Sequence, residues 1–167
     1  MPGKSADTRE GTTSVMQTAN YLLVFLLDAQ PYALRLSAVE RVLRAVAVTP
    51  LPRAPEIVVG IVNVQGRPLP VVDLRRRLGL PRREIELSDR FIVARTMRFP
   101  VILIVDAVVN IIEYEPDTIT FTKKILPKSV SVDGVACVND SMIFIHNLDS
   151  FLSLEEERVI AKALPAV

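Results

Sequence analysis

The sequence has one cysteine, Cys137, one histidine, His146, and no tryptophan. A single cysteine excludes an internal disulfide and is typical of a protein in the reducing cytoplasm. One histidine supplies neither the clustered donors of a metal site nor a base paired with a nucleophile. We therefore expect no catalytic residues, no metal and no cofactor. On this interpretation Cys137 is a buried, inert thiol, and His146 is a strand residue with one satisfied nitrogen.

The chain also lacks a strong net charge and a long hydrophobic run. Its 20 basic and 19 acidic side chains give a formal charge of +1, too small a field to attract nucleic acid or an anionic membrane. The longest apolar stretch, residues 99–112, contains Asp106 and Asn110 and is shorter than the roughly 20 residues of a membrane-spanning helix. We expect a cytoplasmic protein with no nucleic-acid partner and no direct membrane insertion.

What the sequence does contain is an internal repeat. An offset of 74 positions aligns Gly60, Val64, Leu74 and Leu78 with Gly134, Val138, Leu148 and Leu152. A second offset, of 69, aligns Leu34, Ala38 and Val39 with Leu103, Ala107 and Val108. This self-similarity indicates that one supersecondary unit has been duplicated.

Both copies have the pattern of β-hairpins. Apolar segments rich in strand-forming residues predict strands at 21–27, 32–36, 58–64, 91–96, 101–105, 134–138 and 142–146, with a further strand that contains Pro68 and Pro70. Residues 37–42 fit a helical turn or a bent strand equally well. In Val58–Val64, apolar residues occur at both odd and even positions, which point to opposite faces of a strand. This segment is therefore expected to be buried on both faces. Pro68 and Pro70 cannot donate to a ladder, so their strand should be an edge or locally bulged.

Helix signals follow the second hairpin of each copy. Asp73 is placed to cap a short helix over residues 74–78 that ends at Gly79, and Asn147 occupies the equivalent position in the second copy. Ser153 and Glu156 have the spacing of a capping box, which predicts a C-terminal helix.

These elements predict an all-β fold. It consists of two small barrels of about five strands each, packed together through an apolar interface that includes Val62 and Leu103, with short helices and a C-terminal helix. Residues 1–20 are expected to be a disordered lead-in, residues 21–152 the domain, with the two pseudo-repeated barrels exchanging near residues 80–95, and residues 153–167 the C-terminal helix and tail.

One local charge concentration stands out. It consists of Arg75, Arg76, Arg77, Arg82 and Arg83. Acidic residues follow directly and no aromatic side chains are interleaved, so a solvated helix face is the first interpretation, docking of an acidic partner the second and nucleic-acid binding the third. Asp106 is interpreted as a strand-end residue that corresponds to Ser37.

The stretch from Gly60 to Arg75, GIVNVQGRPLPVVDLR, preceded by Tyr32-Ala33-Leu34 and by residues 48–52 (VTPLP), resembles the CheW family. The resemblance extends from about Tyr21 to Leu152 and makes residues 21–152 a single CheW-like domain. It implies a pair of five-stranded SH3-like barrels. It also implies a non-enzymatic adaptor between the cytoplasmic tip of methyl-accepting chemoreceptors and the CheW-like regulatory domain of the histidine kinase CheA, located in the cytoplasm and recruited to receptor arrays at the inner face of the membrane.

The same resemblance implies a partner-binding surface. Its residues would be Val39, Arg41, Gly60, Asn63, Gln65 and Gly66. The family usually has glutamate at the position of Arg41 and arginine at that of Gln65, so we expect altered partner choice. Val39, Gly60 and Gly66 fit a purely structural role equally well. Two other functions stay open: a CheW-like scaffold in another sensory array, such as one that governs pili or surface motility, and a ligand-binding β-barrel sensor.

Overall fold

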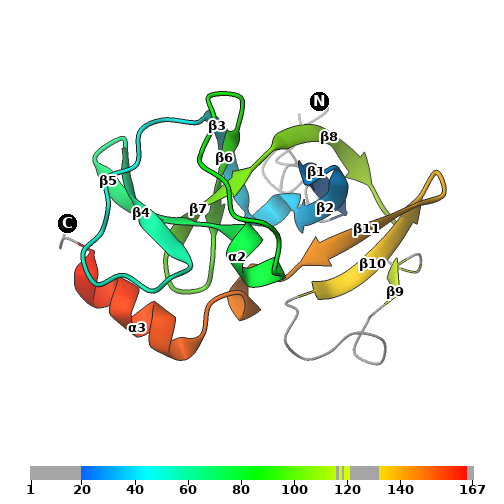
Figure 1. Cartoon of the computed structure of the whole chain (residues 1–167). Helices are drawn as coiled ribbons and strands as arrows, with labels where there is room; N and C mark the ends of the chain where they lie inside the picture. Colours follow the sequence, from blue (N-terminus) through cyan, green and yellow to red (C-terminus); the bar gives the residue numbers. More distant parts are fainter. Residues whose placement is uncertain (1–19, 116, 118, 121–131, 165–167) are drawn as a thin grey trace, which may run out of the picture.

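The structure is a computed structural model that describes residues 20–115, 117, 119–120 and 132–164. Two curved sheets lie side by side, with a short helix between them and a longer helix below one of them (Figure 1). The six-stranded barrel has the strand order β8 (Ala107–Glu113), β1 (Tyr21–Leu27), β2 (Gln30–Arg35), β11 (Ser141–His146), β10 (Val132–Val138) and β9 (Ile119–Thr120). The five-stranded barrel has the order β3 (Val39–Arg44), β6 (Arg90–Arg95), β7 (Pro100–Val105), β5 (Arg67–Val72) and β4 (Val58–Val64).

The predicted all-β fold of two packed barrels is confirmed, and the sixth strand, β9, is only two residues long. The helical elements are η1 (Leu36–Ala38), α2 (Leu74–Leu78), η3 (Leu148–Ser150) and α3 (Leu154–Ala163). The expected disordered lead-in lies almost wholly outside the described residues, as do positions 165–167 of the tail.

Each barrel contains strands from both copies of the repeat. The unit β4-β5-α2 corresponds to β10-β11-η3 at the offset of 74, yet the third strand of each copy pairs with the other copy: β3 with β6, and β8 with β1. The chain passes between the barrels at η1 and at Asp106. Residues 80–95, where we expected the exchange, instead follow β5 and α2 into β6, which lies in the same sheet. The repeats and the barrels are therefore different units.

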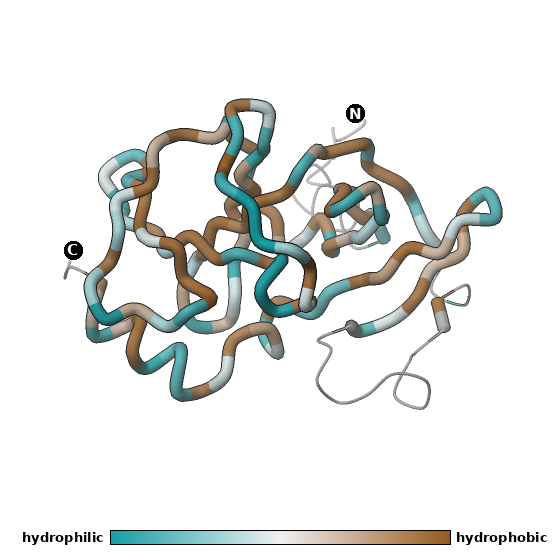
Figure 2. Tube along the Cα trace, in the orientation of Figure 1, coloured by the Kyte–Doolittle hydropathy of each residue, from teal (hydrophilic) through white to brown (hydrophobic). Residues whose placement is uncertain are grey.

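Three apolar clusters form the core. One is enclosed in the five-stranded barrel and one in the six-stranded barrel. The third, the shared cluster, joins both barrels and includes Phe25, Leu103 and Ile160 of α3. The strands that meet at the centre of the molecule are correspondingly hydrophobic, whereas α3 alternates between hydrophilic and hydrophobic residues (Figure 2). Leu103 lies in the shared cluster as expected, but Val62 belongs to the core of the five-stranded barrel alone.

Local sequence explains the helix ends. Asp73 accepts a hydrogen bond from the backbone N–H of Arg75 (3.0 Å), and α2 ends at Gly79 with a left-handed φ of 69°. Asn147 caps η3 in the same way (3.0 Å). Ser153 and Glu156 form the expected capping box at the start of α3.

Strand pairing in the structure settles three points that the sequence left open or predicted wrongly. Residues 37–42 form both alternatives in turn, since η1 is followed by β3. β4 is not buried on both faces: Val62 is buried and Asn63 is exposed, because β4 is the edge strand of its sheet. The strand with Pro68 and Pro70 is not that edge. β5 lies between β4 and β7, but it pairs with β7 only at Val71 and Val72, beyond both prolines.

Candidate partner-binding surface

The tip of the β4–β5 hairpin carries three of the six residues that sequence analysis assigned to partner binding. Gln65 and Gly66 have φ values of 51° and 83°, which is the backbone of a two-residue primed turn. The Asn63 side-chain oxygen accepts a hydrogen bond from the backbone N–H of Gly66 (2.8 Å). All three residues are exposed, so the turn is both fixed in shape and accessible to a partner.

Gly60 is buried, and its role is steric. A Cβ atom at this position would lie 2.2 Å from the backbone oxygen of Thr49 and 2.7 Å from a methyl group of Val48. The connector between β3 and β4 approaches this closely because Thr49 and Ile61 exchange two backbone hydrogen bonds, of 3.0 and 2.8 Å. Gly60 therefore shapes the candidate surface from beneath.

Val39 and Arg41 lie at the start of β3, on either side of Glu40. Val39 is half-buried and packs against the shared cluster, whereas the Arg41 side chain is exposed. A register irregularity between Val39 and Arg41 places Glu40 outside the ladder with β6. Of the two residues, Arg41 is therefore the one available to a partner.

Glu40 connects these two parts of the surface. Its carboxylate lies 3.0 Å from the guanidinium of Arg67, directly after the hairpin turn, and 3.3 Å from that of Arg95 on β6. Its side chain is only 17% exposed, so these ion pairs are partly shielded from water. The start of β3 and the β4–β5 turn thus belong to one surface, which we call the β3 surface. The sequence alone did not indicate Glu40, Arg67 and Arg95 as part of this surface, because strand pairing between distant segments cannot be deduced from their spacing.

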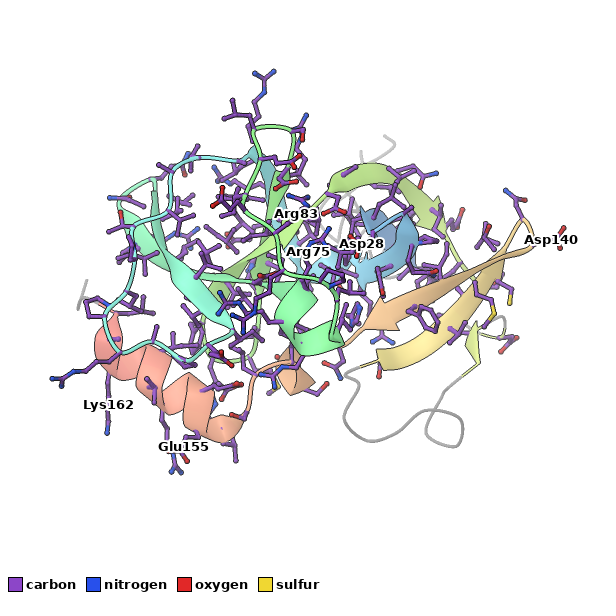
Figure 3. All side chains as sticks on the ribbon, viewed as in Figure 1. Asp28, Arg75, Arg83, Asp140, Glu155 and Lys162 are labelled. Atoms are coloured by element: carbon purple, nitrogen blue, oxygen red, sulfur yellow. The ribbon has the colours of Figure 1, made fainter. Side chains whose placement is uncertain are left out.

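A second group of charges lies where the barrels meet. This inter-barrel ion cluster consists of Asp28, Arg75, Arg83, Asp89 and Asp106. Arg75, on α2, contacts Asp28 at 2.6 Å and Asp106 at 2.8 Å. Figure 3 shows the labelled Asp28, Arg75 and Arg83 side by side at the centre of the molecule. Because Asp28 lies in the β1–β2 turn and Arg75 follows β5, the cluster joins the two barrels.

Asp106 is the residue on which this cluster converges. Its carboxylate accepts hydrogen bonds from Arg75 (2.8 Å), from Arg83 (2.6 Å) and from the backbone N–H of Asp28 (2.9 Å). Burial alone would raise the pKa of Asp106, but the hydrogen bonds from Arg75 and Asp28 outweigh it and lower that pKa. Burial likewise opposes ionisation of Arg75, and its bonds to Asp106 and Asp28 still raise its pKa. Asp106 therefore holds the ion cluster together, a role that its interpretation as a strand-end residue did not include.

The basic run is not a solvated helix face. Arg75 is 6% exposed. Arg83 contacts Asp89 and Asp106, both at 2.6 Å, and these bonds hold its pKa above the ordinary value. The remaining three arginines also have carboxylate partners within the chain, which are Asp73 for Arg76, Glu156 for Arg77 and Glu56 for Arg82. The sequence did not reveal this, because their partners lie up to 79 positions away.

Cys137 and His146 occupy different environments. Cys137 is exposed on β10, so the prediction of a buried thiol is wrong: it lies on the outer face of a strand close to the sheet edge. His146 is buried, and its ring lies 5.2 Å from that of Tyr32 and 6.4 Å from that of Phe151. Burial, and then the charge of Asp28, raise the pKa of Tyr32, which keeps the phenol neutral.

A hollow of about 180 Å³ lies beside His146 between the barrels. It is smaller than the roughly 300–1,000 Å³ of typical small-molecule sites. Of the two acids that line it, Asp133 pairs with Arg35 (2.7 Å) and Asp149 accepts a hydrogen bond from the backbone N–H of Met97 (2.7 Å). The hollow beside His146 therefore does not favour a small-molecule site at that position.

Grouped metal ligands and membrane-spanning helices are both lacking among the residues that the structure describes. No three of their His, Cys, Asp or Glu side chains are grouped to hold a metal ion. None of their helices has the length and apolar character needed to cross a membrane.

Comparison with known proteins agrees with this geometry. Residues 21–156 match the CheW family, described as a CheW-like domain. The chain belongs to the CheW family. It is 32% identical to the chemotaxis protein CheW of Rhizobium meliloti over 81% of this chain and 88% of that protein. It is 26% identical to the chemotaxis protein CheW of Bacillus subtilis over 87% of this chain and 93% of that one.

A solved structure extends the comparison to three dimensions. The scaffolding protein TtCheW from Thermoanaerobacter tengcongensis matches with a TM-score of 0.76 and 29% identity, over 83% of this chain and 95% of that chain. In this CheW-like chain, the residues taken from the family pattern divide into two kinds. Arg41, Asn63, Gln65 and Gly66 are exposed, whereas Val39 and Gly60 lie beneath them.

Proposed function

We propose that this CheW-like protein is a non-enzymatic adaptor that couples chemoreceptors to a CheA-type histidine kinase in chemotaxis. The observation that carries the proposal is the family match over residues 21–156, which takes in both barrels. The partners are the cytoplasmic tip of a methyl-accepting receptor and the regulatory domain of the kinase. The protein works in the cytoplasm and is recruited to receptor arrays at the inner face of the membrane.

Coupling of this kind needs a rigid connection between two contact surfaces. A receptor shifts the kinase equilibrium only by the free energy that its two states transmit differently through the adaptor. The shared apolar cluster and the inter-barrel ion cluster supply such a connection, because both join residues of the two barrels. A movement imposed on one barrel is therefore passed to the other with little loss.

The β3 surface is the proposed receptor-side contact. Arg41 and Gln65 stand where the family usually has glutamate and arginine, so this surface presents a different charge pattern. Like-charge repulsion and lost pairing against a typical partner are worth several kcal/mol at most. The protein is therefore expected to serve a divergent or dedicated array.

The function is tested by affinity capture of the full-length protein from its source cells. Mass spectrometry should identify a CheA-type kinase and a receptor, whose genes also separate chemotaxis from pilus or surface-motility arrays. Capture of neither would refute the adaptor function. Partner choice is tested with the Arg41→Glu/Gln65→Arg double variant, which should gain affinity for a typical receptor tip. The control is Arg158→Glu on α3, which is exposed and lies outside the β3 surface.

A further inference from the structure

β3 is an open sheet edge. It is the terminal strand of its sheet, and in the described part of the chain it pairs with β6 alone. The N–H and C=O groups on its other side are therefore available to an additional strand. β4, at the opposite end of the sheet, is partly covered, because Thr49 bonds to Ile61.

The charge of this edge is predominantly positive. β3, β6 and the first residue of β5 carry a single acid, Glu40, together with five arginines, Arg41, Arg44, Arg67, Arg90 and Arg95. Glu40 is shared between Arg67 and Arg95. Among the described residues no carboxylate pairs with Arg41, Arg44 or Arg90.

Arg44 lies directly opposite Arg90 in the β3–β6 ladder, and like charges in that position weaken a sheet. The Arg90 guanidinium donates hydrogen bonds to the backbone oxygens of Ser88 (2.9 Å) and Asp89 (3.0 Å). Arg44 is therefore left to be neutralised by a carboxylate from outside the described part of the chain. The edge is thus better matched to an acidic neighbour than to solvent alone.

Comparison with the duplicated edge shows that the fold does not require this charge. β8 is the equivalent strand at the offset of 69, and it too ends its sheet. It contains no arginine, and its Val109 and Ile111 are each 52% exposed. The two edges have the same geometry but different chemistry.

We propose that β3 binds an acidic, extended segment of a partner protein as an added strand. The inference rests on the proposed adaptor function, because it specifies the chemistry of one partner of the β3 surface. Arg41 and Arg44 are three residues apart and so lie on opposite faces of the sheet. The bound segment should therefore carry two carboxylates at an odd spacing, with a spacing of three giving a match to both arginines.

The test uses the full-length protein and a fluorescein-labelled ten-residue peptide of Thr and Val with two Glu three positions apart. Fluorescence anisotropy should detect binding that weakens as salt is raised. The Arg41→Glu/Arg44→Glu variant should bind about two- to thirtyfold more weakly, because it loses both exposed ion pairs with the peptide. Arg158→Glu makes the same kind of charge change on α3 and should leave binding unchanged.

Two further peptides separate strand addition from simple charge attraction. A peptide with Lys in place of Glu should not bind. A peptide with N-methylated alternate backbone amides keeps both carboxylates and should lose most of the affinity, because it cannot complete a ladder. Equal binding by the N-methylated peptide, or equal weakening by Arg158→Glu, overturns the proposal. So does stronger binding to phosphatidylserine vesicles or to single-stranded DNA.

Failure of the strand-addition inference can be distinguished from failure of the adaptor function. If the acidic peptide fails to bind while the kinase and receptor are still captured by the Arg41→Glu/Arg44→Glu variant, the adaptor function stands and the strand-addition inference is wrong. Circular dichroism of each variant confirms that the fold is retained.

Discussion

Replacing Asp106 with asparagine should weaken the connection between the two barrels. The substitution keeps the shape of the side chain but removes the charge that accepts hydrogen bonds from Arg75 and Arg83. Hydrogen bonds to charged groups are worth about 1.5–3 kcal/mol each. Both arginines keep another carboxylate, Asp28 for Arg75 and Asp89 for Arg83, and the Asp106 side chain is 25% exposed. We therefore expect a loss of about 2–3 kcal/mol in the free energy of unfolding.

Urea unfolding measures this loss. Tyr21, Tyr32 and Tyr114 lie on or directly beside strands of the six-stranded barrel, so tyrosine fluorescence reports on that barrel, while far-UV circular dichroism reports on both. Both probes should show one coincident transition with a lower midpoint and an unchanged m-value. The control is Arg82→Ala, which breaks an exposed pair whose side chains are 65% and 84% accessible. It should cost no more than about 0.5–1 kcal/mol.

The stability difference between wild type and the Asp106→Asn variant should depend on pH. The pKa of Asp106 is lower in the folded protein than in the unfolded chain, so its contribution is complete above the unfolded value of about 3.9 and is lost as the pH falls through the folded value. The stability difference between wild type and Asp106→Asn should be constant from pH 5 to 8 and shrink below about pH 4. A difference under about 0.5 kcal/mol at pH 7, or one that grows in acid, would show that the cluster does not hold the barrels together.

Three other substitutions test separate features. Gly60→Ala should cost more than about 2 kcal/mol in urea unfolding, because its Cβ would meet Thr49, whereas Gly66→Ala, which has open space but a left-handed φ, should cost about 1 kcal/mol; equal losses would contradict the steric argument. Leu103→Ala should cost about 2–5 kcal/mol and lower the stability of both barrels together in calorimetry, and two separate transitions would contradict it. Cys137 should react with a thiol reagent in the folded protein as fast as in urea, and protection in the native state would show that it is buried.

Local signals in the sequence were sufficient to predict the helix caps and the internal repeat. The caps at Asp73, Asn147 and Ser153 were all identified from spacing alone, since a capping residue and its partner lie within three positions. The internal repeat was visible for a similar reason: it compares the chain only with itself. These signals were enough to predict the fold class, whereas the adaptor function was predicted from the resemblance to the CheW family.

Pairing between distant segments could not be predicted in this way. The basic run was placed correctly as α2 and its continuation, but its charges are neutralised by Asp28, Asp106 and Glu156, which no local pattern connects to it. The prediction that Cys137 is buried was wrong for a related reason. Its apolar neighbours suggested burial, whereas exposure is decided by the face of β10 on which a residue lies: Ala136 is buried and Cys137, next to it, is exposed.

The candidate surface shows the same division. Family resemblance pointed to Arg41 and Gln65, and both are exposed as a contact residue must be. It did not separate them from Gly60, whose role became clear only from the 2.2 Å approach of Thr49. It also passed over Glu40, because the ion pairs with Arg67 and Arg95 join three strands that are far apart in the sequence.

The exchange of strands between the repeats bears directly on coupling. Because β3 completes the sheet of β6, and β8 completes that of β1, separating the two repeats would break ladder hydrogen bonds. Separating the two barrels would instead break the shared apolar cluster and the inter-barrel ion cluster. An adaptor made of two barrels joined by a simple linker could bend under the load of its partners and would transmit little of a receptor's bias. Here the chain crosses between the barrels at η1 and at Asp106, and the shared apolar cluster and the ion cluster join them, so bending would disrupt contacts that also stabilise the fold and the stiffness of the adaptor depends on these inter-barrel contacts.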